Sequence, residues 1–137
     1  MKSLIDKNLL EAYSKTVFLV GLQETDVIIG SSSEDLFSSF DGHFTTCALI
    51  SSYNPFGKII SKSKNEERNI EFSHYLSNKY IILPYTTYNH EHPLVVENGF
   101  AILDISHEDS SSIGILCEQD AIVFCELSKL SKLILLR

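Results

Sequence analysis

Polar side chains on one side of a predicted helix are the residues in this sequence best placed to do chemistry. Asn65, Arg68 and Asn69 follow one another at helical spacing. Phe72 and Leu76 continue the same face, and two large apolar side chains point that face toward the core. A polar group that faces inward needs a hydrogen-bond partner or a ligand. The sequence therefore predicts a polar cluster, and a candidate site, at the start of this helix.

The chemistry predicted for this cluster is the binding of an anion. Arg68 is a bidentate donor whose geometry suits a carboxylate or a phosphate. The first helical turn adds backbone N–H groups without intrahelical partners and the positive end of the helix dipole. Asn54 ends the preceding strand beside this turn. A structural role stays open, because Ser61 or Ser63 can cap the helix and Arg68 can pair with an internal carboxylate such as Glu97.

Three functions are open for these residues. The leading hypothesis is a small binding or regulatory domain, in which Arg68 anchors an anion and Asn65 and Asn69 donate hydrogen bonds. Glu97 would be an acceptor there. An alternative is an enzyme that uses Glu97 as general acid/base and Arg68 as electrostatic stabiliser. The third is an acidic protein–protein interaction module, similar to an immunity protein or an antitoxin.

The cluster must be positioned by a strand before it and by strands that bring Glu97 close. Apolar runs rich in β-branched and aromatic residues predict strands, and helical spacing of apolar residues predicts helices. Hairpins are included, so we expect an α+β (mixed α/β) fold with one mixed, mostly antiparallel sheet and three to four helices packed on it. Strands are predicted over 16–22, 26–30, 44–53, 80–88, 99–105, 121–127 and 132–136, and helices over 3–14, after a cap at 31–33, and over 61–78 and 106–118.

The predicted core lies on the central strands and on the helix that carries the cluster. The last apolar run, 133–136, is more hydrophobic than an exposed sheet edge should be. We expect it to be covered by a helix of its own chain or by a second copy, which leaves a homodimer open. The residues expected to be buried are Leu49, Ile50, Phe72, Leu76, Ile102, Val123 and Phe124.

Composition narrows the class of protein. The chain of 137 residues is 44% hydrophobic and 21% charged, which predicts one folded domain over residues 1–137. A net charge of −7 gives no basic footprint for nucleic acid, although it suits a basic protein partner. No run is long enough to span a membrane, and the amino-terminal segment lacks the features of a signal peptide. Three cysteines without CxxC spacing predict reduced thiols, so we expect a cytoplasmic protein.

Other motifs give no metal or cofactor. His90 and His92 share one side of an extended segment, but the spacing fixes no third ligand. A phosphate loop, a GxGxxG fingerprint and a Gly-x-Ser-x-Gly elbow are all missing from the sequence. We therefore predict no metal and no cofactor, and the sequence does not decide whether the protein is an enzyme.

A wider pattern extends over most of the chain. Asn54-Pro55 is followed by the helical cluster, and Ile29-Gly30 with Leu36, Glu97 before an apolar strand, and Gln119-Asp120-Ala121-Ile122 complete it. This pattern resembles the bacterial family known as Domain of Unknown Function 3293. Two departures lie around Glu97, where the family's tryptophan is missing and Asn98-Gly99 replaces a Pro-Ser-like pair.

The resemblance implies no activity. It implies instead that the polar residues act as one group, and it adds Gln119 to them. The resulting set of suspected ligand-binding residues is Asn54, Ser61, Asn65, Arg68, Asn69, Glu97 and Gln119.

Overall fold

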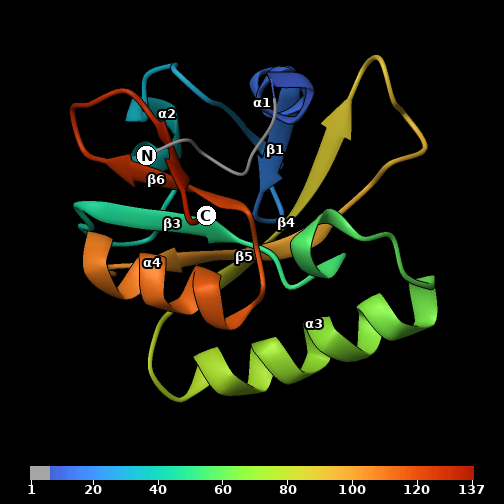
Figure 1. Ribbon diagram of the computed structural model, residues 1–137. Helices are drawn as coiled ribbons and strands as arrows, with labels where there is room; N and C mark the ends of the chain where they lie inside the picture. Colours follow the sequence, from blue (N-terminus) through green and yellow to red (C-terminus); the bar gives the residue numbers. More distant parts are fainter. Residues whose placement is uncertain (1–6) are drawn as a thin grey trace.

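Seven antiparallel strands and the helices that pack on them make up the computed structural model, which describes residues 7–137 (Figure 1). The predicted α+β class is confirmed, and the first four residues of the helix predicted over 3–14 lie outside the described residues. The elements are α1 (Lys7–Ser14), β1 (Thr16–Val20), β2 (Thr25–Ile28), α2 (Glu34–Ser38), β3 (Thr46–Ile50), the 3-10 turn η1 (Pro55–Gly57), α3 (Lys62–Ser77), β4 (Ile82–Asn89), β5 (Asn98–Leu103), α4 (His107–Leu116), β6 (Ala121–Glu126) and β7 (Lys132–Leu135).

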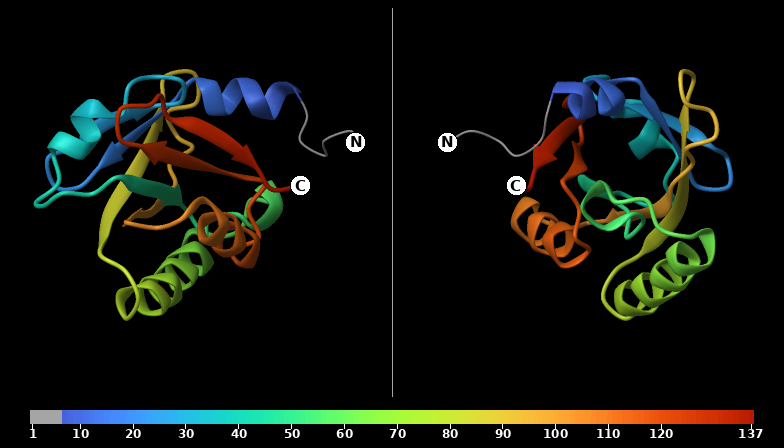
Figure 2. Two further views of the ribbon diagram at one scale, coloured as in Figure 1. Left: turned by 90° about the vertical axis from the view of Figure 1, so that its left-hand side faces the viewer. Right: turned by 45° about the vertical axis from the view of Figure 1, so that its right-hand side comes forward.

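The sheet curls until its two ends meet. Its strand order is β2-β1-β4-β5-β3-β6-β7, and every neighbouring pair is antiparallel. Ser32, after β2, forms an isolated bridge with Leu130, before β7. The backbone N–H of Gly30 donates to the carbonyl of Ser131 at 2.9 Å, and the N–H of Ser131 donates to the carbonyl of Ser31 at 2.8 Å. The sheet therefore has an inner and an outer face, as the two views in Figure 2 show.

Both faces of the central strands are buried. In β3, Cys47 and Leu49 point into the inner core, whereas Ala48 and Ile50 point to the outer core. Residues of α2 pack into the inner core, and α3 and α4 cover the outer one. Burial on both sides explains why this strand reads as an almost continuous apolar run. All the residues predicted to be buried are so: Leu49, Ile50, Phe72, Leu76, Ile102, Val123 and Phe124.

The apolar C-terminal run is packed by its own chain. Leu133 lies against the inner core, and Ile134 and Leu136 lie against the outer core. A Cβ atom at Gly114 in α4 would lie 2.5 Å from Cδ1 of Leu136, so the missing side chain lets the helix approach β7 closely. Cover by the same chain is therefore partial, because Leu133, Ile134 and Leu136 are half-buried whereas Leu135 is 43% exposed. The homodimer stays a prediction.

We predict that Phe72→Ala lowers the free energy of unfolding by about 3–5 kcal/mol, because it empties part of the outer core. The Phe72 ring is buried and packs edge-on against Phe100, with ring centroids 5.8 Å apart. Ile70 in the same helix is 58% exposed, so Ile70→Ala is the control and should cost less than about 1 kcal/mol. Urea unfolding measures both, and equal losses would contradict the orientation of α3.

Candidate functional site

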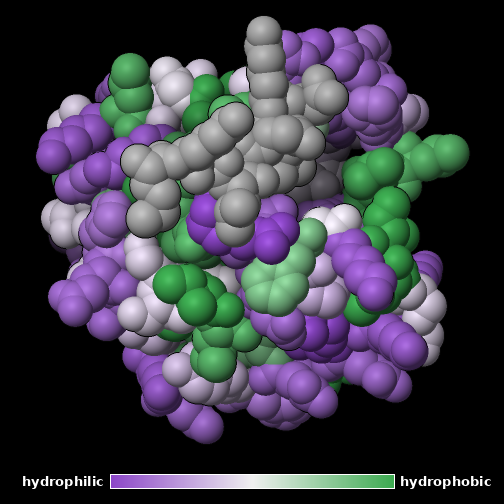
Figure 3. Space-filling view, viewed as in Figure 1, coloured by the Kyte–Doolittle hydropathy of each residue, from purple (hydrophilic) through white to green (hydrophobic). Residues whose placement is uncertain are grey.

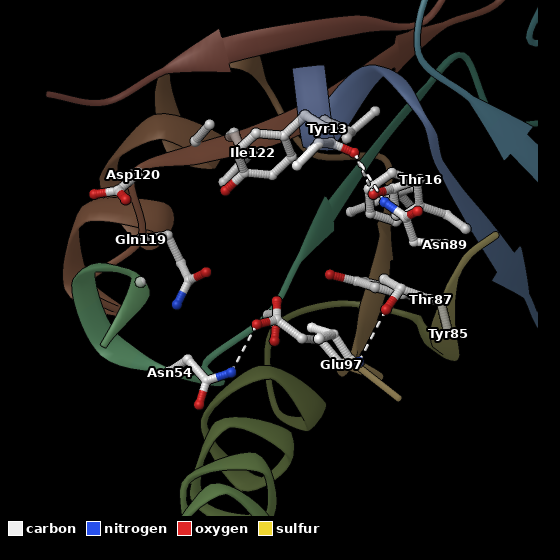
Figure 4. A pocket seen from close by; sticks show the side chains of 18 of the residues that line it. Tyr13, Thr16, Asn54, Tyr85, Thr87, Asn89, Glu97, Gln119, Asp120 and Ile122 are labelled. Carbon is white, nitrogen blue, oxygen red and sulfur yellow. Dashed lines mark hydrogen bonds between the residues drawn. The ribbon is translucent and has the colours of Figure 1, made fainter. Parts of the chain in front are cut away.

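A cavity of about 260 Å³ lies inside the curled sheet, between α1 and the turn that follows β3. We call it the inner cavity. Figure 4 shows polar side chains pointing into it from opposite sides. Apolar side chains line most of the rest. The residues with polar side chains that line the inner cavity are Tyr13, Thr16, Ser51, Asn54, Tyr85, Thr87, Asn89, His92, Glu97, Gln119 and Asp120.

Asn54 holds the wall of the cavity at the end of β3. Its backbone is left-handed, with φ of 47°, a conformation that asparagine tolerates better than most residues. Its N–H donates to Oδ1 of Asn65 at 2.8 Å. Its own Oδ1 accepts from the N–H of Ile60 at 3.2 Å and from Nδ2 of Asn65 at 2.9 Å. Because a backbone N–H can only donate, these bonds fix which side-chain atom is oxygen, and Nδ2 must face Glu97.

The carboxyl group of Glu97 meets that amide inside the cavity. Asn54 Nδ2 donates to Oε2 of Glu97 at 2.9 Å. The Glu97 backbone is fixed to β4, because its N–H donates to Oγ1 of Thr87 at 2.9 Å and its carbonyl accepts from the Thr87 N–H at 2.9 Å. No lysine, arginine or histidine within residues 7–137 forms an ion pair with this carboxylate.

Burial raises the pKa of Glu97 above its ordinary value, and the hydrogen bond from Asn54 offsets part of that rise. Since the amide of Asn54 only donates, Oε2 must accept in both protonation states. The proton of the neutral acid is therefore carried by Oε1, for which no protein partner is found among the described residues. Glu97 thus presents either a proton or a negative charge to the inner cavity.

Gln119 and Asp120 lie on the wall of the cavity opposite Glu97, with the carboxylate of Asp120 turned away from Glu97 (Figure 4). Nε2 of Gln119 donates to the carbonyl of Tyr53 at 3.0 Å and to that of Cys117 at 3.2 Å, so both of its hydrogens are engaged. Its Oε1 is left as an acceptor. The buried carboxylate of Asp120 forms an ion pair with Arg137. The two carboxylates of the cavity therefore differ, because among the cations of the described residues one is paired with Asp120 and none with Glu97.

Arg68 binds elsewhere. Its Nε donates to the carbonyl of Ser52 at 2.6 Å, and one terminal nitrogen donates to the carbonyl of Cys117 at 3.0 Å. Its other terminal nitrogen lies 3.4 Å from Oε1 of Glu118. The predicted pairing with Glu97 is thus wrong. The physical reason is that the carbonyls at the end of β3 and at the end of α4 lack ladder or helix partners, and the guanidinium satisfies both.

Among the remaining residues of the predicted cluster, Ser61 and Asn65 hold neighbouring segments in place, whereas Asn69 neither does so nor lines the inner cavity. Ser61 caps α3, where its Oγ accepts from the N–H of Lys64 at 3.2 Å. Asn65 is buried and holds Asn54. Oδ1 of Asn69 is buried and finds no hydrogen-bond partner within residues 7–137, and Asn69 does not line the inner cavity. Of the suspected set, those that line the cavity are Asn54, Glu97 and Gln119. That they bind a ligand stays a prediction.

Sequence reasoning missed several residues of the cavity. Tyr85, Thr87 and Asn89 occupy every second position of β4 and so share one face. Polar residues at this spacing were the sequence feature that could have identified them. Tyr13, in α1, also lines the cavity. Burial, followed by the nearby carboxylates of Glu97 and Asp120, raises the pKa of its phenol.

The His90–His92 segment does not gather further ligands. Glu91, between the two histidines, forms an ion pair with Lys15 at 2.9 Å, and Nδ1 of His90 lies 3.5 Å from the hydroxyl of Tyr88. Over the described part of the chain, no three His, Cys, Asp or Glu side chains are grouped as a metal site would require. No helix within residues 7–137 has the length and apolar character needed to cross a bilayer.

Fold and site together define an α+β domain whose curled antiparallel sheet encloses a cavity with acidic groups. The chain belongs to the family described as "Protein of unknown function (DUF3293)", whose pattern matches residues 50–122. The match begins at the end of β3 and ends in β6, so it includes Asn54, Glu97 and Gln119 but not Tyr13. No curated protein and no solved structure matches the chain.

We predict that Arg68→Ala lowers the free energy of unfolding by about 2–4 kcal/mol, because two carbonyls lose a charged donor. Glu118→Gln is the control. It removes only the ion pair, which is partly exposed on both sides, and should cost no more than about 1 kcal/mol. Chemical denaturation of both variants tests this, and similar losses would mean that the ion pair, not the carbonyl contacts, holds Arg68.

We predict that Glu97→Gln stabilises the protein at alkaline pH. Glutamine keeps an acceptor for Asn54 but cannot ionise. Because the folded protein holds the Glu97 proton more tightly than the unfolded chain does, wild-type stability falls as pH rises from about 4.5 through the raised pKa. The melting-temperature difference between variant and wild type should therefore grow with pH. Lys15 lowers the pKa of Glu91, so the control Glu91→Gln should show the opposite trend. Parallel trends would contradict the assignment.

Proposed function

We propose that this protein binds a small polar ligand in the inner cavity. The observation that carries the proposal is the half-buried carboxyl of Glu97, which forms no ion pair with any residue within 7–137 and keeps one oxygen without a protein partner there. A carboxyl in such surroundings lowers the stability of the fold, and groups of this kind concentrate at binding and catalytic sites. The donors first expected to hold an anion, Arg68 and Asn69, do not line the cavity, so the ligand we propose is polar rather than anionic.

A second candidate function is an enzyme in which Glu97 acts as general acid/base. The raised pKa of Glu97 supports it, because a carboxyl that titrates closer to neutral pH exchanges protons more effectively there. The role first given to Arg68 is not supported, since the guanidinium is engaged by the carbonyls of Ser52 and Cys117. Conversion of a bound compound, rather than its binding alone, would distinguish the enzyme.

Two further proposals concern the surroundings of the protein. Binding of a basic protein is supported by the net charge of −7 alone. A cytoplasmic location is supported by the three free, buried cysteines, Cys47, Cys117 and Cys125. Neither proposal involves the inner cavity.

The test of the binding function is a thermal-shift screen of small polar compounds on the wild type, Glu97→Gln and a control, Glu71→Gln. Glu71 is exposed on α3 and does not line the cavity. We expect a compound that raises the melting temperature of the wild type and of the control equally. Its affinity for Glu97→Gln should fall about tenfold, the loss expected for one hydrogen bond to a charged group. Equal affinity for all three proteins would place the compound outside the inner cavity and contradict the proposal.

A further inference from the structure

The amide nitrogens around the inner cavity are engaged, whereas two of its acceptors are open. Gln119 donates to the carbonyls of Tyr53 and Cys117, and Asn54 donates to Glu97. Asn89 follows the same rule, because its Nδ2 lies 3.4 Å from the carbonyl of Ala12. Oε1 of Glu97 and Oε1 of Gln119 are two acceptors of the lining for which no protein partner is found among the described residues. A ligand that completes these hydrogen bonds must therefore be a donor.

The charges of the side chains that line the cavity indicate the sign of the charge on its ligand. Glu97 and Asp120 line the cavity, and no lysine or arginine among residues 7–137 does. Asp120 already has Arg137 beside it, so within residues 7–137 Glu97 is the carboxylate of the cavity without a positive partner. The rings of Tyr13 and Tyr85 also line the cavity, and aromatic faces attract cations. Donor capacity and positive charge occur together in an ammonium group.

The rest of the cavity is apolar. Leu49 and Val123 lie in its interior, and Ile59 and Val95 lie at its mouth. Ile59 is 80% exposed and Val95 is 52% exposed, while Leu94 beside it is 95% exposed. In the space-filling view, apolar side chains gather over the loop between β4 and β5 (Figure 3). A ligand with an apolar group would cover side chains that otherwise face water.

We infer that the ligand of the inner cavity is a primary amine, bound as its ammonium ion between Glu97 and Gln119, with a short apolar group directed toward Ile59 and Val95. This inference rests on the proposed function and names the class of ligand. A primary amine fits better than a quaternary one, because only N–H groups can satisfy the two open acceptors. The volume of about 260 Å³ has room for roughly nine groups the size of a water molecule, which accommodates a hexyl chain with its amine.

Binding of an ammonium ion should be coupled to a proton. An ammonium beside Glu97 favours the carboxylate, so a Glu97 that is neutral before binding releases its proton. Affinity for the amine should therefore increase as pH rises. The other titratable groups that line the cavity are Tyr13 and Tyr85, whose raised pKa values keep them neutral, Asp120, which is paired with Arg137, and His92. Because His92 lines the same cavity, His92→Gln is the necessary control.

The experiment uses three compounds of equal chain length, hexylammonium chloride, 1-hexanol and sodium hexanoate, in calorimetric titrations of the full chain. We expect hexylammonium to bind about tenfold more tightly than hexanol, and hexanoate to bind most weakly. Titrations in buffers of different ionisation enthalpy should show proton release, and affinity should rise as pH increases from about 4.5, the ordinary pKa of a glutamate, through the raised pKa of Glu97. Glu97→Gln should remove the advantage of the amine over the alcohol, whereas His92→Gln should keep both the advantage and the pH dependence.

Three results would overturn the inference: tighter binding of hexanoate, equal binding of hexylammonium to wild type and Glu97→Gln, or no binding of any of the three. Amide resonances of Thr87, Glu97 and Gln119 locate the binding. If hexanol or hexanoate shifts them and hexylammonium does not, the amine is wrong but the binding cavity is right. If none of the three shifts them, the amine is wrong, and the binding function fails too only when the thermal-shift screen gives no compound sensitive to Glu97→Gln.

Discussion

The side-chain amide of Asn54 is the contact on which the architecture of the site depends. It joins three segments that are distant in sequence: the turn after β3, the first turns of α3 through Asn65, and the start of β5 through Glu97. Its hydrogen bonds fix the orientation of the amide. Ile60 and Asn65 donate to the oxygen, so the nitrogen is the atom that faces Glu97. The orientation of a carboxyl inside the sheet is thereby set by a helix outside it.

The cavity itself follows from the curling of the sheet. A curled sheet encloses an interior that must be filled, and α2 with the apolar residues of β1, β3 and β6 fills one part. In the other part, the inward face of β4 changes from Tyr85 to Thr87 and Asn89, whose shorter polar side chains leave space. Gly99 of β5 leaves room for the ring of Tyr85, because a Cβ at this position would lie 2.5 Å from Cζ of Tyr85 and 2.6 Å from the carbonyl of Ile50.

Local patterns were sufficient to predict the elements, and they failed where partners depend on strand order. Every strand predicted from apolar runs is present, and the face of α3 that carries Asn65 and Phe72 does point inward. The predicted partner of Arg68 is wrong because the sequence does not give the strand order. Since β5 and β6 both flank β3, two carboxylates, Glu97 and Glu118, lie within reach of the same region. Periodicity along one helix cannot decide which of two strands or loops stands opposite each of its turns.

The arginines near the cavity do not stabilise the carboxyl of Glu97. Two arginines lie close enough to the site to matter, and each is committed elsewhere: Arg68 to backbone carbonyls and Arg137 to Asp120. A carboxyl buried only for packing would be stabilised by such a cation, or replaced by an apolar side chain of similar volume. The fold instead gives Glu97 one neutral donor, which orients the group without neutralising it. Under the proposed function, an ammonium ligand would supply the positive charge that no residue within 7–137 places beside Glu97.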